Sequence, residues 1–214
     1  MIIPDTDNPP LQLDFTDPAL LYRLRTSGKR QGIGKAVGLD KARFSLQVLD
    51  CTAGLGRDAL VLAHLGCEVT MLERSQPVHD MLAAAMERAA VHPELQQTLK
   101  RMTLFRCSAQ DWFASMGQDS RRQPDVIYLD PMFPARQKSA KVKKDMAMLQ
   151  KLLAPDEDIS EVLEMALLHA KYRVVVKRPP GKWALPGPEP AFTVSGKASH
   201  FSVYTNKSLS SMPL

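Results

Sequence analysis

The sequence has 214 residues, of which 44% are hydrophobic and 24% are charged, as in an ordinary globular chain. This length suits one sizeable α/β domain with small extensions and is short for two domains. The formal net charge of +5 favours a polyanionic partner without specifying one. No apolar run approaches the roughly 20 residues that cross a bilayer, and the first residues lack a signal-peptide pattern. We therefore expect a soluble, cytoplasmic protein without a membrane partner.

The cysteines and histidines do not have the spacing of a metal site or of a disulfide framework. Cys51, Cys67 and Cys107 are widely spaced and lie in or beside apolar runs, as reduced, mostly buried thiols do. The five histidines show no ligand spacing. The sequence therefore predicts no metal site.

Residues 1–43 are predicted to form a basic extension ahead of the main domain. Residues 1–20 are rich in proline and aspartate, and residues 22–43 carry basic side chains against a single acid, Asp40. Glycines at positions 28, 32, 34 and 38 argue against one regular helix over this stretch. The segment is either a basic arm that faces a polyanion or a solvated surface arm.

Residues 44–214 show the alternating pattern of an α/β domain. Buried strands are expected at 46–50, 68–72, 102–106, 125–130 and 172–177. Helices are expected between them at 56–66, 77–90, 109–116 and 159–170. Residues 191–195 and 200–205 are two further strands with a short link, which indicates a C-terminal β-hairpin. The pattern predicts a mostly parallel, doubly wound sheet, on which ligands bind beyond the carboxyl ends of the strands.

A glycine turn follows the first expected strand. Gly54 and Gly56 allow the backbone to approach a ligand closely, and Glu73 ends the next strand, where an acid can accept both hydroxyls of an adenosine ribose. Dinucleotide enzymes share this arrangement, but Asp50 and Asp58 would repel a diphosphate. These acids suit the ammonium and sulfonium of S-adenosylmethionine, although Asp58 can also complement a helix dipole. The sequence therefore predicts S-adenosylmethionine as the cofactor.

The fourth expected strand ends in Asp130-Pro131-Met132-Phe133, which resembles the (Asn/Asp)-Pro-Pro-(Tyr/Phe) motif of methyltransferases that modify exocyclic amino groups. Such an amine is a poor nucleophile because its lone pair is delocalised into the ring. Asp130 and a carbonyl in the turn stiffened by Pro131 can accept its two N–H groups and orient the nitrogen. Phe133 can stack on an extruded base. These three residues are the candidate catalytic residues; the alternative is an ordinary turn with a core phenylalanine.

Basic side chains gather near the same edge of the expected sheet. They occur in residues 22–43, after the fourth strand and after the fifth. This distribution indicates a phosphate-backbone footprint, with scattered surface lysines as the alternative. The candidate RNA contacts are Arg23, Arg30, Lys138, Lys143, Lys177 and Arg178.

Three segments together resemble the ribosomal small-subunit RNA methyltransferase J family. They are DCTAGLGRDALVLAHLGCEVTMLER (50–74), VIYLDPMFPARQKSAKVKKDM (126–146) and RVVVKRP (173–179). GIGKAVG (32–38) is also similar to the family, and the resemblance covers most of residues 14–205. It implies a Rossmann-like class I methyltransferase that modifies the exocyclic N2 of a guanosine in small-subunit (16S) rRNA. It also accounts for Met132, because the family uses the form DPMF.

The resemblance further implies a set of cofactor contacts and a partner. The implied contacts are Arg57-Asp58, Glu73-Arg74, Ser108-Ala109 and Asp130. Ala109 replaces the second serine of a family Ser-Ser pair, and Asp17-Pro18 replaces a Gly-Gly pair. The chain also begins later than typical members, so we expect weaker RNA docking with an intact cofactor pocket. The expected partner is small-subunit rRNA or the 30S particle.

Other functions stay open from the sequence alone. An adenine-N6 or protein-glutamine methyltransferase uses a related motif, and a non-catalytic RNA-binding assembly factor could keep the same fold. The presence of Asp50, Glu73 and Asp130 counts against the assembly factor, because a degenerate site need not retain these acids.

Overall fold

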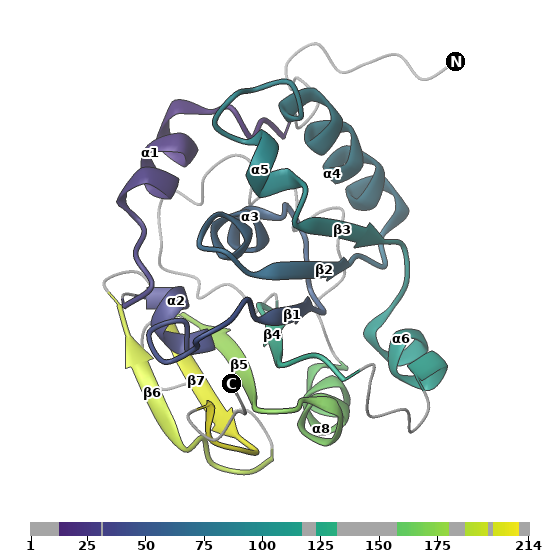
Figure 1. Ribbon diagram of the computed structural model, residues 1–214. Helices are drawn as coiled ribbons and strands as arrows, with labels where there is room; N and C mark the ends of the chain where they lie inside the picture. Colours follow the sequence, from purple (N-terminus) through teal and green to yellow (C-terminus); the bar gives the residue numbers. More distant parts are fainter. Residues whose placement is uncertain are drawn as a thin grey trace, which may run out of the picture.

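The computed structural model describes residues 13–30, 32–116, 123–131, 158–179, 187–196 and 199–209. Within these ranges a seven-stranded sheet forms the centre of the molecule (Figure 1). Its strands are β1 (Gln47–Asp50), β2 (Glu68–Leu72), β3 (Met102–Phe105), β4 (Val126–Leu129), β5 (Arg173–Arg178), β6 (Phe192–Ser195) and β7 (His200–Thr205). Their order across the sheet is β3-β2-β1-β4-β5-β7-β6.

The sheet is parallel from β3 through β5 and antiparallel beyond it. This confirms the predicted mostly parallel sheet and the C-terminal hairpin of β6 and β7. The strand of the hairpin that joins the sheet is β7, which pairs with β5 along its whole length, while β6 forms the edge. The burial of the strands agrees with this order, because four of the six residues of β7 are buried whereas β6 is mostly exposed.

Helices cover both faces of the sheet. One face carries α1 (Pro18–Thr26), α2 (Gly32–Val37), α3 (Arg57–His64) and α4 (Gln76–Ala89), which share one hydrophobic cluster. The short α5 (Gln96–Leu99) packs against α3. The other face carries α6 (Ala109–Met116) and α8 (Ile159–His169), which share a second cluster. Because both faces are covered, the centre of the sheet is buried; all four residues of β4 are buried.

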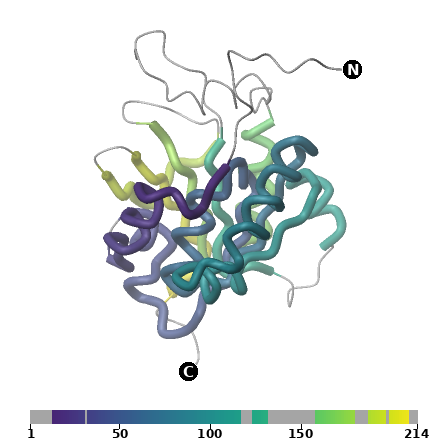
Figure 2. The backbone as a smooth tube through the Cα atoms, turned by 90° about the horizontal axis from the view of Figure 1, so that it is seen from above, coloured from purple at the N-terminus to yellow at the C-terminus, as the bar shows by residue number. Residues whose placement is uncertain are grey.

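The described part of the N-terminal segment packs into the first of these clusters. Asp17 caps α1, because its Oδ1 accepts hydrogen bonds from the backbone N–H groups of Ala19 (3.0 Å) and Leu20 (3.1 Å). Pro18 occupies the first turn, so the Asp17-Pro18 pair starts a helix. Helix α1 contacts α3, whereas α2 contacts β5, β6 and β7, and Figures 1 and 2 show α2 beside these last strands. The boundary at residue 43 stays a prediction, but residues on both sides of it share one core.

Three further observations concern the cysteines, membrane-spanning helices and groups of metal ligands. All three cysteines are free thiols, with Cys51 and Cys67 buried and Cys107 partly exposed. Among the described residues, no helix is both long enough and apolar enough to span a bilayer. In the same part of the chain, no group of three potential metal ligands comes together.

Candidate active site

The two glycines of the turn after β1 serve different purposes. Both have left-handed backbones, with φ of 51° at Gly54 and 64° at Gly56. A Cβ on Gly56 would lie 2.7 Å from Cδ1 of Leu82 and 3.3 Å from Cζ of Phe15, so Gly56 permits close packing of α3 and α4. A Cβ on Gly54 would meet only the Thr52 carbonyl, at 3.9 Å. The open space at Gly54 suits the close approach of a ligand to the backbone.

Glu73 lies directly after β2 and closes this turn. Its Oε2 accepts a hydrogen bond from the backbone N–H of Gly54 at 2.9 Å, and Oε1 accepts one from Ser75 at 2.7 Å. Glu73 is buried, so these bonds hold the carboxylate in one orientation. A carboxylate is an acceptor-only group with two oxygens, which is the chemistry that the two hydroxyl groups of a ribose require. Glu73 therefore fits the ribose of an adenosine cofactor.

Asp50 ends β1 and is 2% exposed. Its Oδ1 accepts a hydrogen bond from the backbone N–H of Thr52 at 3.0 Å. Burial raises the pKa of Asp50 to about 8, and the negative charges of Asp58 and Asp130 add to this effect, while the bond from Thr52 opposes it. A buried acid with so little compensation favours a cationic ligand beside it. Asp50 thus fits the ammonium group of S-adenosylmethionine.

The loop after β3 is held by the start of α6. Ser108 caps this helix: its Oγ donates a hydrogen bond to Asp111 Oδ2 at 2.7 Å and accepts one from the Asp111 backbone N–H at 3.1 Å. Ala109 is buried at the first position of α6. The loop after β3, which we expect to face the adenine ring of the cofactor, is therefore held by local hydrogen bonds.

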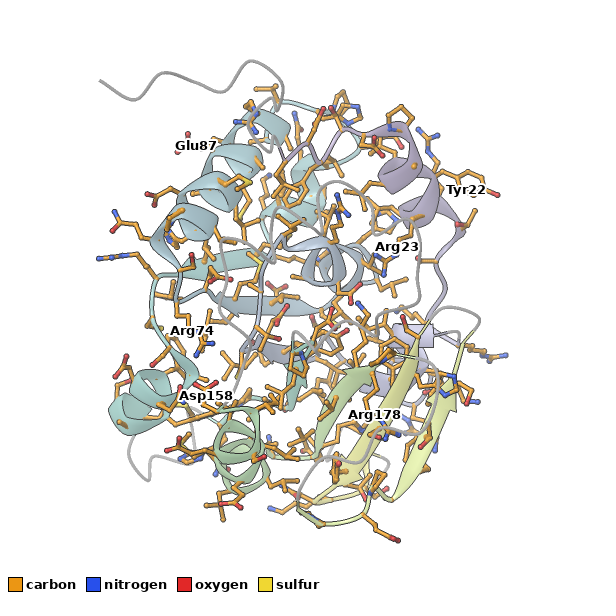
Figure 3. The ribbon with its side chains drawn as sticks, turned by 180° about the vertical axis from the view of Figure 1, so that it is seen from behind. Tyr22, Arg23, Arg74, Glu87, Asp158 and Arg178 are labelled. Atoms are coloured by element: carbon orange, nitrogen blue, oxygen red, sulfur yellow. The ribbon has the colours of Figure 1, made fainter. Side chains whose placement is uncertain are left out.

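The side chain of Arg74, which follows Glu73, points toward the face of the sheet that carries α6 and α8. Its Nη1 lies 2.8 Å from Oδ2 of Asp158, the residue that precedes α8, and Figure 3 shows the two residues side by side. Gln110 donates a hydrogen bond to the same oxygen at 2.7 Å. This cluster ties the end of β2 to the starts of α6 and α8.

A network of charged and polar side chains, the Lys177 network, joins α1, α3, β4 and β5. It consists of Arg23, Asp58, Tyr128, Asp130 and Lys177. Asp58 accepts hydrogen bonds from Arg23 Nη2 (2.5 Å), Tyr128 Oη (2.7 Å) and Lys177 Nζ (2.7 Å). Burial favours the neutral acid, but the positive charges of Lys177 and Arg23 outweigh it and lower the pKa of Asp58 to about 2.

Asp130 lies directly after β4, at the edge of this network. Its Oδ2 accepts a hydrogen bond from Lys177 Nζ at 2.6 Å, and its backbone N–H donates to Thr52 Oγ1 at 2.6 Å. Burial raises the pKa of Asp130 to about 6; the charge of Lys177 opposes this effect and that of Asp58 adds to it. The residue whose carboxyl the sequence assigned to the target amine is thus held at its side chain by Lys177 and at its backbone by Thr52.

The structure gathers the predicted cofactor residues in one region. They lie at or just beyond the carboxyl ends of β1 to β4: Asp50, Gly54, Gly56, Arg57, Asp58, Glu73, Arg74, Ser108, Ala109 and Asp130. A contact of each with the cofactor stays a prediction. Pro131 is buried next to Asp130, while Phe133 lies outside the described residues.

The predicted RNA contacts fall into different environments. Arg30 is exposed between α1 and α2, and Arg178 is partly buried at the end of β5. Arg23 extends from α1 toward the centre of the molecule, where it meets Asp58, whereas the neighbouring Tyr22 points outward (Figure 3). The ammonium of Lys177 is engaged by two carboxylates of the site. Lys138 and Lys143 lie outside the described residues.

Sequence reasoning missed the network because it treated Arg23 and Lys177 as surface charges. One signal for Lys177 was present: it directly follows the apolar run of β5, at the same strand end as Asp130 on β4. Thr52 and Tyr128 were not expected to take part either. The partners of all four residues come from distant parts of the chain, so local patterns do not indicate them.

The strand order, the glycine turn after β1 and the acids after β1, β2 and β4 define a class I S-adenosylmethionine-dependent methyltransferase. A family model described as a putative SAM-dependent methyltransferase matches residues 3–206. The chain is also similar to curated proteins named ribosomal RNA small subunit methyltransferase J. The relative from Pseudoalteromonas atlantica is 50% identical over 90% of this chain and 75% of its own length. That from Thioalkalivibrio sulfidiphilus is 48% identical, over 91% and 76%. The chain belongs to the ribosomal RNA small subunit methyltransferase J family.

Solved structures agree with this assignment. A SAM-dependent methyltransferase from Neisseria gonorrhoeae is 34% identical with a TM-score of 0.70, covering 91% of this chain and 74% of that chain. The rRNA methyltransferase aviRa from Streptomyces viridochromogenes is 11% identical with a TM-score of 0.53, covering 80% of each chain, and supports the fold alone. The predictions of the fold class, of the family and of S-adenosylmethionine as cofactor are therefore confirmed.

Proposed function

We propose that this protein methylates the exocyclic N2 of a guanosine in small-subunit rRNA. The names of its relatives support small-subunit rRNA as the substrate. The observation that carries the proposal is the partly exposed Asp130 carboxyl directly after β4, held by Lys177 beside the acids that suit the cofactor. A fixed carboxylate at this place matches the need of a weakly nucleophilic amine for an acceptor that orients its N–H groups.

The acids after β1 and β2 would hold the cofactor. Asp50 would pair with its ammonium group, and Glu73 would accept hydrogen bonds from its ribose hydroxyls. When bound, S-adenosylmethionine supplies an electrophilic methyl group on a sulfonium and leaves as a neutral thioether. The open space at Gly54 and the capped start of α6 at Ser108 would accommodate the remainder of the molecule.

Asp130 would act on the target amine. An ionised carboxylate accepts an N–H of the amine and directs the nitrogen lone pair away from itself, and the backbone at Pro131 would restrict the turn beside it. With a pKa of about 6, Asp130 is mostly ionised at neutral pH. The amine loses one proton when it is methylated, and the Asp130 carboxylate is in a position to accept it.

The basic side chains would bind the RNA backbone. Arg30 and Arg178 lie on the described part of the surface, and Lys138 and Lys143 belong to the same proposed set outside it. Arg23 and Lys177 would contribute mainly through the carboxylates that they bind. The substrate would be naked rRNA or the 30S particle, and we place the reaction in the cytoplasm, where ribosomal subunits are assembled.

The test is incubation with labelled S-adenosylmethionine and either naked rRNA or under-modified small subunits, followed by nucleotide mapping. We expect label on N2 of a single guanosine, with fully modified subunits as the unlabelled control. Label in adenine or in protein would contradict the guanine target, and RNA binding without label would indicate an assembly factor. We also expect Phe133→Ala to impair RNA methylation more than cofactor binding; an equal loss of both would argue against base stacking.

A further inference from the structure

Lys177 bonds to two acids of the site that lie on different elements, Asp58 in α3 and Asp130 after β4. It is the fifth residue of β5, and its Nζ lies 2.7 Å from Asp58 Oδ2 and 2.6 Å from Asp130 Oδ2. The pairing of β4 with β5 ends at Leu129 and Val176. One further step along both strands sets Asp130 beside Lys177, with side chains on the same face of the sheet. The sheet register itself therefore brings this pair together.

The charges around Lys177 are balanced, so the loss of one cation leaves an excess of negative charge. Asp58 and Asp130 meet two cations, Lys177 and Arg23. Arg23 bonds to Asp58. Lys177 is the described cation that forms an ion pair with Asp130. A buried carboxyl that loses its cation becomes protonated more easily, and a protonated carboxyl has lost part of its acceptor capacity.

The two oxygens of Asp130 have different environments. Lys177 binds Oδ2, and the backbone N–H of the same residue is held by Thr52 Oγ1. Within the described part of the chain, Oδ1 takes no part in this ion pair. The side chain of Lys177 is 24% exposed, so its ammonium is shielded while it holds the carboxylate. The arrangement anchors one oxygen and leaves the other for a hydrogen-bond donor.

We propose that Lys177 is a positioning residue for methyl transfer, which holds the Asp130 carboxylate charged and fixed through Oδ2 while Oδ1 accepts an N–H of the target amine. This inference rests on the proposed function. Methyl transfer forms a nitrogen–carbon bond, breaks the sulfur–carbon bond and releases one proton from the nitrogen. A charged, oriented carboxylate serves both the alignment of the amine and the removal of that proton.

The first test is the pH profile of kcat/KM for Lys177→Met, which removes the charge and keeps an unbranched side chain. We expect the acidic limb to move upward by about 1 to 3 pH units, the effect of an opposite charge at this distance. At pH 7 the rate should fall on the order of 10-fold and recover at higher pH, since each pH unit changes the ionised fraction about tenfold. Lys177→Arg should keep the limb near its original place.

Lys171→Met is the matched control. Lys171 precedes the same strand, is largely exposed and lies 3.8 Å from Asp125, at the opposite end of β5. Its replacement should leave the pH profile unchanged. An acidic limb that is the same in Lys177→Met and in the wild type would overturn the proposed role.

The second test does not depend on activity. Carbon-13 carboxyl NMR, with Asp130→Asn to assign the resonance, follows the titration of Asp130 directly. We expect Asp130 to titrate at higher pH in Lys177→Met than in the wild type. An unchanged titration overturns the role of Lys177, whereas a wild-type protein that labels no guanine overturns the proposed function, so the two failures are distinguishable.

A third comparison separates the effect of Lys177 on the Asp130 titration from its effect on the stability of the fold. Lys177→Met leaves Asp58 and Asp130 short of one cation, so we also compare Asp58→Asn with Asp58→Asn/Lys177→Met, in which position 58 is neutral. The same upward shift of the Asp130 titration is expected between these two proteins. A lysine with a purely structural role would lower the melting temperature and leave this titration in place.

Discussion

The two halves of the site hold their acids in different ways. In the cofactor half, Asp50 and Glu73 accept hydrogen bonds from backbone N–H groups that are 2 to 19 residues away along the chain. In the target half, Asp58 and Asp130 are held by side chains, and Lys177 lies 119 and 47 residues away from them along the chain. The cofactor half is thus built by local turns, whereas the target half depends on the assembly of the whole sheet.

This difference has electrostatic consequences. Backbone N–H groups fix the orientation of a carboxylate but bring no full charge, so buried Asp50 keeps a pKa raised to about 8. Lys177 and Arg23 bring full charges, and the pKa of Asp58 is lowered to about 2 despite its burial. Asp50 in the cofactor half therefore favours a cationic ligand. In the target half, Lys177 and Arg23 already balance the negative charges of Asp58 and Asp130.

The largest expected effect is in the target half. Asp130→Asn should lower methyl transfer on the order of 100- to 1,000-fold, the range for removing one preorganised electrostatic contact, with little change in cofactor binding. Single-turnover rates with labelled cofactor and calorimetric affinities measure the two effects. Asp80→Asn, at an exposed position of α4, is the control. Near-wild-type turnover in Asp130→Asn would remove the distinction between the halves.

The next effect concerns the cofactor half. Glu73→Gln should weaken S-adenosylmethionine binding by about 10- to 100-fold, because a hydrogen bond to a charged group contributes about 1.5–3 kcal/mol. The affinity is measured by calorimetry, and Glu87→Gln is a matched control because Glu87 is exposed on α4 (Figure 3). If Glu73→Gln lost transfer but kept its affinity, Glu73 would belong functionally to the target half.

Cofactor binding should also depend on pH through Asp50. With a pKa of about 8 in the free protein, Asp50 is mostly protonated at pH 7, and a cationic ligand favours its charged form. Binding should therefore release a proton and tighten by up to about tenfold per pH unit between pH 6 and 8. Calorimetry in buffers of different ionisation enthalpy counts the proton. Asp50→Asn should bind weakly and without this pH dependence; an unchanged pH dependence would rule out Asp50 as its source.

The same titrations predict opposite contributions to stability. The pKa of Asp50 is raised on folding, so its contribution is present below about pH 3.8 and is lost as the pH rises through about 8. The pKa of Asp58 is lowered, so its contribution is present above about pH 3.8 and is lost as the pH falls toward about 2. Melting temperatures of Asp50→Asn and Asp58→Asn across this range, compared with the wild type, separate the two contributions.

The smallest expected effects distinguish the two glycines. Alanine at either position adopts a left-handed backbone at a cost of about 1–2 kcal/mol, but only Gly56→Ala also brings a Cβ to 2.7 Å from Leu82. Gly56→Ala should therefore unfold at lower urea concentration than Gly54→Ala. Gly54→Ala should have the larger effect on cofactor affinity relative to its stability. Equal losses of stability would contradict the packing role of Gly56.

Much of the fold and of the cofactor half could be predicted from local patterns. Apolar runs indicated the strands to within one or two residues, and Asp50, Glu73 and Asp130 were recognised because each ends or directly follows a strand. Carboxyl ends of parallel strands meet at one edge of a sheet, so positions along the chain were enough to place these acids together. The short helices α1 and α2 were not expected, because glycines interrupt that segment and packing against the sheet stabilises it.

The sequence by itself determined the class of protein, its cofactor and the position of the acid that we propose to face the target amine. The tertiary structure alone decided that β7 lies inside the sheet and that Arg23 and Lys177 both pair with Asp58. The physical reason is the range of the interactions. Turns and strand ends follow from neighbouring residues, whereas an ion pair between distant residues forms only when the complete sheet sets both side chains side by side.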